Sequence, residues 1–103
     1  MSALLQVVRT DEPRTIRLVG ELDASNADDL LIDLDPELNS GGDLTLDLGA
    51  LAFIDSLGLR SLLRMAHTLD AGRLILREPQ PGVGRTLDII GVEKMTNISV
   101  AKG

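Results

Sequence analysis

The order of apolar and polar positions along the chain predicts strands that alternate with helices. Residues 4–9 (LLQVVR) and 15–20 (TIRLVG) are rich in β-forming residues, and the polar segment TDEPR between them leaves room only for a tight turn. We therefore expect an antiparallel hairpin at the start of the chain. Three further strands are predicted at residues 44–48, 73–78 and 95–100.

A first helix is predicted after the hairpin. Ser25 and Asp28 resemble a capping box in which Asp takes the place of Glu. Gly41 and Gly42 follow the helix and can adopt the positive φ of a helix C-terminus. The apolar residues at helical spacing in this segment are Ala27, Leu30, Leu31, Leu34 and Leu38.

Two more helices are predicted in the second half of the chain. One runs from about residue 57 to residue 69 and is stopped by Gly72, and a short one is closed by Gly91. The residues expected on their buried faces are Leu59, Leu62, Leu63, Ala66 and Leu69 in the longer helix and Val83, Leu87 and Ile90 in the shorter one.

The succession β-β-α-β-α-β-α-β indicates a single α/β domain over residues 1–103. Strand–helix–strand units favour right-handed crossovers with parallel pairing, whereas the opening hairpin is antiparallel. We therefore expect a mixed sheet of about four or five strands with about three helices.

Composition narrows the partners that the chain can bind. Its formal net charge is −6, which disfavours binding to nucleic acid and to anionic lipid. It has one Phe, no Trp and no Tyr, so the aromatic platforms on which bases stack are missing. It has no Cys and a single His, and no phosphate-binding glycine loop is present. We expect no metal site and no cofactor.

The N-terminal segment MSALLQVVRT has neither the basic leader nor the long apolar run of a signal peptide. No segment approaches the roughly 20 apolar residues that a membrane helix requires. We therefore expect a cytoplasmic protein that does not insert into a membrane.

Hydrolytic and phosphoacceptor chemistry are both disfavoured. His67, the single histidine, follows Ser56 on the same predicted helix at a distance of roughly 16 Å, too far to act as its base. No G-x-S-x-G motif is present. Asp11, Glu12 and Asp55 are placed as in a response-regulator receiver, but a receiver has a helix where this chain has only a turn. We therefore do not expect an enzyme.

Three acidic residues and one serine are expected at one edge of the sheet. Asp23 ends the second strand, Asp47 lies near the end of the third, and Asp55 and Ser56 follow the connection after it. In α/β folds the carboxyl ends of parallel strands build sites at one edge. Capping of the next helix explains Asp55-Ser56, but it does not explain Gly58 in the first turn, which costs on the order of 1 kcal/mol relative to Ala. Glycine there allows another backbone to approach closely.

The segments VGELDASNADDL, LTLDLGALAFIDSLGLRSLL and RLILREPQPGVGRTLDIIGVEKM resemble the STAS domain of bacterial anti-sigma factor antagonists. The resemblance covers nearly the whole chain, in order and with similar spacing. Its most specific parts are G-E-L-D and I-D-S-x-G-L. It implies a STAS-like mixed sheet with helices, which agrees with the predicted order of elements.

The resemblance also implies a partner-switching function. Family antagonists bind an anti-sigma factor that is also a serine kinase, and so free a sigma factor. The kinase phosphorylates the Ser of the D-S-x-G motif, here Ser56 after Asp55, and a phosphatase resets the protein. Asp23 of the G-E-L-D loop lies beside that site in the family. Arg60 and Arg64, one turn apart on the second helix, are candidate contacts to the partner.

One departure from the family concerns the residue after the phosphorylated serine. Many relatives have Ser or Thr there, whereas this chain has Leu57, so a single hydroxyl is available. The alternative function is a non-switching STAS subunit of a transport or stress-signalling complex, which needs no phosphorylation. STAS domains have been proposed to bind nucleotides, but no phosphate loop in this sequence predicts it.

Overall fold

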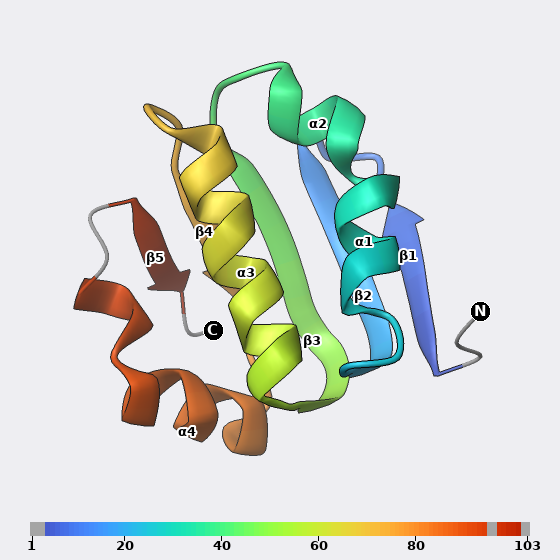
Figure 1. Cartoon of the computed structure of the whole chain (residues 1–103), viewed down its shortest axis with the longest axis vertical. Coiled ribbons are helices and arrows are strands. Elements are labelled where there is room, and N and C mark those ends of the chain that lie inside the picture. The colour runs from blue at the N-terminus through green and yellow to red at the C-terminus, as the bar shows by residue number, and fades with distance from the viewer. Residues whose placement is uncertain (1–3, 95–96, 102–103) are drawn as a thin grey trace.

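The computed structural model describes residues 4–94 and 97–101, which form one five-stranded mixed sheet (Figure 1). The strands lie in the order β1-β2-β3-β4-β5, with β1 antiparallel to β2 and each later neighbouring pair parallel. The predicted hairpin and the parallel crossovers are confirmed. The strands are β1 (Leu5–Arg9), β2 (Thr15–Leu22), β3 (Leu44–Ile54), β4 (Leu74–Arg77) and β5 (Ile98–Ala101).

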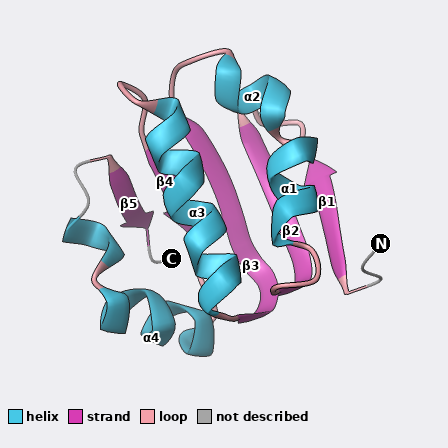
Figure 2. Ribbon diagram, viewed as in Figure 1, coloured by secondary structure: helices cyan, strands magenta, loops and turns pink. Residues whose placement is uncertain are grey.

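Three helices cover one face of this sheet, and a fourth lies at its end near the start of α3 (Figures 1 and 2). None of the helices formed by the described residues is long and apolar enough to cross a bilayer. The helices are α1 (Ala27–Asp33), α2 (Asp35–Asn39), α3 (Ser56–Leu69) and α4 (Pro81–Ile90), followed by the short 3-10 helix η1 (Val92–Lys94).

The core lies between the sheet and these helices and is built mainly of leucine. In β3, Leu44, Leu46 and Leu48 are fully buried, whereas Thr45 and Asp47 between them are half-buried. Successive side chains of a strand point to opposite faces of the sheet. Asp47 therefore lies on the face that points away from α1 and α3.

The predicted first helix is two short helices, and its predicted cap is wrong. Pro36 is the second residue of α2, and because proline cannot continue a preceding helix, α1 ends at Asp33 and a new helix begins. The residue that precedes α1 is Asn26, not Ser25, and no side chain caps the helix.

The glycines expected to end the first two helices have different roles. Gly41 and Gly42 have the predicted positive φ, at 78° and 84°. Gly72 does not stop α3, because Asp70 already ends the helix with a φ of 56°. A Cβ at Gly72 would lie 2.0 Å from the carbonyl oxygen of Gly42, so this glycine permits a close contact between two loops.

The last third of the chain follows the prediction with small differences. Helix α4 is closed by Gly91 with a φ of 76°, as predicted. Ile90, expected in the core, is 55% exposed. The last strand begins at Ile98, and residues 95 and 96, where its start was predicted, lie outside the described residues.

Strand β3 is much longer than predicted, and this difference positions the site. It continues through the segment expected to be a connection and ends at Ile54, which is paired with Leu22 at the end of β2. The loops that leave β2 and β3 therefore start side by side, one leading to α1 and the other directly to α3.

Candidate functional site

Asp55 joins the β2–α1 loop to the start of α3. Its Oδ1 accepts a hydrogen bond from the N–H of Gly58 at 2.8 Å, which caps α3, and its Oδ2 accepts one from the N–H of Ala24 at 3.1 Å. Its own N–H donates to the carbonyl of Leu22 at 3.2 Å. One residue therefore fixes the loop and the helix to each other.

Gly58 allows α3 to begin directly against the end of β2. A Cβ at this position would lie 2.6 Å from the carbonyl oxygen of Leu22 and 3.0 Å from Cγ1 of Ile54. The first of these distances is shorter than any ordinary contact of a Cβ atom, so a larger residue would push α3 away from the sheet. The close approach predicted from the sequence is confirmed.

Asp23 organises the β2–α1 loop from within. Its Oδ1 accepts hydrogen bonds from the N–H of Ser25 at 2.9 Å and from the hydroxyl of Ser25 at 2.5 Å. Buried Asn26 accepts from the N–H of Asp23 at 3.0 Å and donates to the carbonyl of Glu21 at 2.9 Å. The hydroxyl expected to cap α1 is thus used by Asp23, and the loop is held in one shape beside α3.

Ser56 is the first residue of α3, and its side chain is exposed. Its hydroxyl makes no hydrogen bond within the described residues, since the capping position is taken by Asp55. The next side chain, Leu57, is 44% exposed. An accessible hydroxyl beside an exposed aliphatic side chain, both on a fixed turn, suits contact with another protein.

Two features of α3 define the surroundings of Ser56. His67 lies in the last turn of α3 and Ser56 is the first residue, so the helix places the two groups far apart. The start of a helix favours an anionic group through its free N–H groups and its dipole. The described residues hold no group of three or more His, Cys, Asp or Glu that could bind a metal ion.

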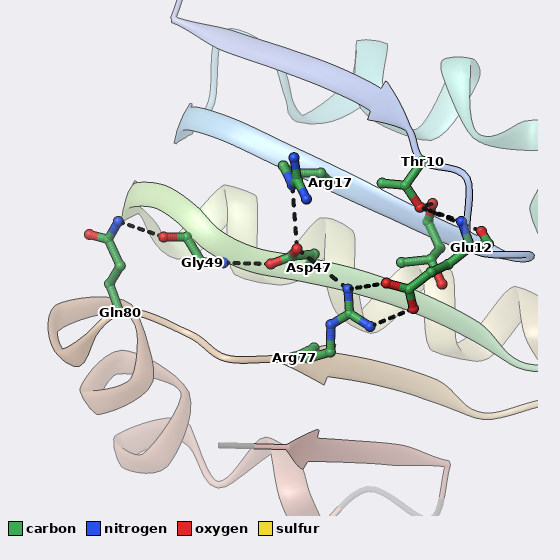
Figure 3. Close-up of polar contacts among 8 residues, drawn as sticks. Thr10, Glu12, Arg17, Asp47, Gly49, Arg77 and Gln80 are labelled. Atoms are coloured by element: carbon green, nitrogen blue, oxygen red, sulfur yellow. Dashed lines mark hydrogen bonds and ion pairs between the residues drawn. The ribbon is translucent and has the colours of Figure 1, made fainter. Parts of the chain in front are cut away.

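Asp47 does not lie at this edge, and the prediction that placed it there is wrong. Because β3 continues to Ile54, Asp47 lies within the strand on the face away from α1 and α3 (Figure 3). Its Oδ2 pairs with Nε of Arg17 at 3.4 Å and with Nη2 of Arg77 at 3.5 Å. Its Oδ1 accepts from the N–H of Gly49 at 2.9 Å, where β3 carries an extra residue relative to β2.

The charges around Asp47 form a structural network. Burial would raise the pKa of Asp47, but the hydrogen bonds from Gly49, Arg17 and Arg77 outweigh burial and hold this pKa below its ordinary value. Arg77 also donates from Nη1 to Oε2 of Glu12 at 2.9 Å, which lowers the pKa of Glu12 and raises that of Arg77. The network ties β2, β3 and β4 to the turn between β1 and β2.

Arg60 and Arg64 are exposed on α3, one and two turns after Ser56. They line a cleft between α3 and the two preceding helices. The structure therefore brings Asp23, Asp55 and Ser56 together and places Arg60 and Arg64 on the adjoining helix. The hydrogen bond from the N–H of Ala24 to Asp55 was not predicted from the sequence. Every residue except proline has a backbone N–H, so the identity of residue 24 gives no sign of this bond.

Comparison with known proteins agrees with this architecture. The profile of the family described as "Mlab, STAS domain" matches residues 5–98. No curated protein sequence matches the chain. Several solved structures have the same fold. The anti-sigma factor antagonist SpoIIAA in its unphosphorylated form is 22% identical, with a TM-score of 0.72 over 95% of this chain and 88% of the other.

Two further structures extend the comparison. An anti-sigma factor antagonist from Mycobacterium paratuberculosis is 20% identical, with a TM-score of 0.82 over 96% of this chain and 86% of the other. The Bacillus cell fate determinant SpoIIAA in its phosphorylated form is 21% identical, with a TM-score of 0.66 over 95% of this chain and 91% of the other. At these identities the likeness is one of fold.

Proposed function

The chain belongs to the STAS domain family, and on this premise we propose that it is an anti-sigma factor antagonist that is switched by phosphorylation of Ser56. Unphosphorylated, it binds an anti-sigma factor that is also a serine kinase, and a sigma factor is released. Phosphorylation by that kinase ends the binding, and a phosphatase restores it. The chain is then a binding module and a kinase substrate rather than an enzyme.

The observation that carries this proposal is the exposed hydroxyl of Ser56 on a fixed turn, which forms no hydrogen bond with any other residue in the described part of the chain. Asp55 holds that turn through both of its carboxylate oxygens, at 2.8 Å and 3.1 Å from their donors. A kinase can therefore reach the hydroxyl without unfolding the helix. The similar structures of SpoIIAA in an unphosphorylated and a phosphorylated form support a phosphate on this fold.

A phosphate on Ser56 would change binding more than folding. It adds about −1.5 to −2 charge at the start of α3, where the helix dipole favours an anion. The carboxylates of Asp55 and Asp23 repel it, so it projects into solvent. A partner would then have to desolvate a hydrated dianion, and a loss of about 3 kcal/mol would lower its affinity roughly a hundredfold.

The surface that we propose for partner contact is centred on Ser56. It excludes Asp47, which belongs to the network on the other face of the sheet. Gly58 is buried and sets the position of α3 against β2, so it acts by placing the contact residues. The residues proposed around Ser56 are Asp23, Asp55, Leu57, Gly58, Arg60 and Arg64.

A non-switching STAS subunit of a transport or stress-signalling complex is the second candidate. One observation favours it: the matching family is described by the name Mlab and not as an antagonist family. Such a subunit would bind its partner equally well whether or not Ser56 carried a phosphate. The two candidate functions therefore differ in whether Ser56 is phosphorylated and whether the phosphate changes partner binding.

We expect the purified chain, incubated with ATP and with each anti-sigma kinase encoded in the same genome, to gain one phosphate on Ser56. Mass spectrometry of tryptic peptides locates it. Ser56→Ala should abolish the modification. Ser40→Ala is the matched control, because Ser40 is also an exposed serine but follows α2, outside the proposed surface, and this variant should be phosphorylated like the wild type. A kinase that binds the chain firmly and leaves Ser56 bare would contradict the proposal.

A further inference from the structure

The solvent side of α3 carries Ser56 and Arg60 on the same face. An α-helix has about 3.6 residues per turn, so side chains four positions apart lie one above the other. Ser56 and Arg60 have this spacing, and both are exposed. Gly58 and Leu59, which lie between them in the sequence, are buried. Ser56 and Arg60 are therefore neighbours on the outer surface of the helix.

The direction of side chains on a helix brings the two groups closer. Every Cα–Cβ bond is tilted toward the N-terminus of the helix, and long side chains lean back over the preceding turn. For Arg60, the preceding turn is the first turn of α3, which begins with Ser56. Cβ atoms at this spacing are about 5–6 Å apart. A guanidinium group at this position can therefore reach a group attached to the serine oxygen.

No carboxylate competes for Arg60 within ion-pairing distance. In the part of the chain that the structure describes, Arg60 forms no ion pair, whereas Arg9, Arg17 and Arg77 each pair with a carboxylate. Asp28 of α1 lines a hollow of about 250 Å³ together with Arg60, but the two side chains are not paired. The guanidinium group is therefore available to an anion that forms on its own helix.

The acidic groups near Ser56 would direct a phosphate toward this arginine. Asp55 precedes Ser56, and its carboxylate is held in place by two backbone N–H groups. Asp23 lies in the adjoining loop. Both carboxylates would repel a dianion on Ser56, and both come before α3, whereas Arg60 lies one turn into the helix. Repulsion from one side and attraction from the other therefore favour the same direction.

We propose that a phosphate on Ser56 is bound by Arg60 of the same chain, so that phosphorylation removes a cation from the contact surface as well as adding an anion to it. A phosphate presents three acceptor oxygens, and a guanidinium group can donate two parallel hydrogen bonds to them. Before phosphorylation, Arg60 is exposed and can contact a partner. Afterwards its charge is neutralised within α3. This inference rests on the proposed phosphorylation of Ser56, but the pairing itself requires neither a kinase nor a partner.

A full chain made with phosphoserine at position 56 tests the pairing without a kinase. Titration followed by 31P NMR measures the second pKa of the phosphate, which is ordinarily about 6. Arg60→Gln should raise this pKa by about 0.3 or more, because a neighbouring cation stabilises the dianion. Arg64→Gln is the matched control: it removes the same charge from an exposed position one turn further along α3, and it should change the pKa by less than about 0.1.

The guanidinium group provides a second readout. In the 15N-labelled chain, the Nε–H resonance of Arg60 should shift when position 56 carries phosphoserine, and that of Arg64 should stay in place. The proposal is overturned if the Arg60 resonance does not respond, or if the two variants change the pKa of the phosphate equally. Neither result bears on whether a kinase modifies Ser56, which mass spectrometry of the kinase-treated chain tests separately.

Discussion

Asp55 and Ser56 have different roles at the start of α3, which the sequence alone did not distinguish. Either residue could have capped α3, and the structure gives the cap to Asp55, whose second oxygen holds the β2–α1 loop. Because the cap is already made, the exposed hydroxyl of Ser56 is left without a partner among the residues that the structure describes. Capping and presentation of the serine are therefore two parts of one arrangement and not competing explanations.

At the same scale, Gly58 gives a direct test of how tightly α3 sits on β2. Gly58→Ala should destabilise the fold by about 2 kcal/mol, because its Cβ would lie 2.6 Å from the carbonyl oxygen of Leu22. Urea unfolding followed by circular dichroism measures the change. Gly82→Ala is the control: a Cβ there meets nothing within 4 Å, so this change in the first turn of α4 should be neutral or slightly stabilising. Equal stability of the two variants would show that the contact at Gly58 is not tight.

At the scale of elements, β3 shows what the hydrophobic pattern can and cannot predict. Residues 44–48 alternate clearly and were predicted as a strand, whereas the segment GALAF after them has no alternation. It is nevertheless strand, because it pairs with β2 up to Leu22 and Ile54. The early end predicted for this strand is also what misplaced Asp47 at the edge of the sheet.

Arg9 of β1 connects this strand to two helices that come later in the chain, α1 and α2. Its Nε donates to Oε2 of Glu37 in α2 at 2.6 Å, and its Nη1 donates to Oδ1 of Asp33 in α1 at 3.3 Å. The hydrogen bond from Arg9 lowers the pKa of Glu37 below its ordinary value of 4.5. A carboxyl group whose pKa is lowered by folding stabilises the fold above its unfolded pKa, and this contribution is lost as the pH falls through the folded value.

The ion pair between Arg9 and Glu37 should therefore make the stability of the fold depend on pH. At pH 7, Glu37→Gln should lower the free energy of unfolding by about 1 kcal/mol, a modest value because Arg9 is partly exposed. The difference from wild type should shrink as the pH falls below 4.5 and through the lowered folded pKa of Glu37, as measured by urea unfolding at each pH. Asp11→Asn, at an exposed acid without an ion pair in the described chain, should show little effect. A Glu37→Gln deficit that stays constant with pH would rule out the ion pair as its cause.

At the scale of the whole molecule, the order of elements and the length of each connection were enough to predict the fold. The five-residue turn after β1 forces a hairpin, and the helix-containing connections later in the chain allow parallel strands. Contacts between distant residues were not predictable in this way. The pair formed by Glu12 and Arg77 joins residues 65 positions apart, and a single sequence carries no sign of it. The candidate site was found because its parts, G-E-L-D and D-S-x-G, are local.

The two faces of the sheet also carry different features. The helical face carries Ser56 and the cleft between α3 and the two preceding helices, and the open face of the sheet carries the ion pairs around Asp47 (Figure 3). This separation gives a control for any binding study. A change at Asp47 should alter stability without altering affinity for a partner that binds beside Ser56.

The central claim is that a phosphate on Ser56 decides whether this chain binds its partner. It is tested most directly by isothermal titration of the anti-sigma kinase, in the absence of ATP, with four forms of the full chain: wild type, phosphorylated wild type, Ser56→Ala and Ser56→Asp. Wild type and Ser56→Ala should bind with the same affinity, and the phosphorylated form and Ser56→Asp should bind roughly a hundredfold and tenfold more weakly. Equal affinity of all four forms would contradict the account.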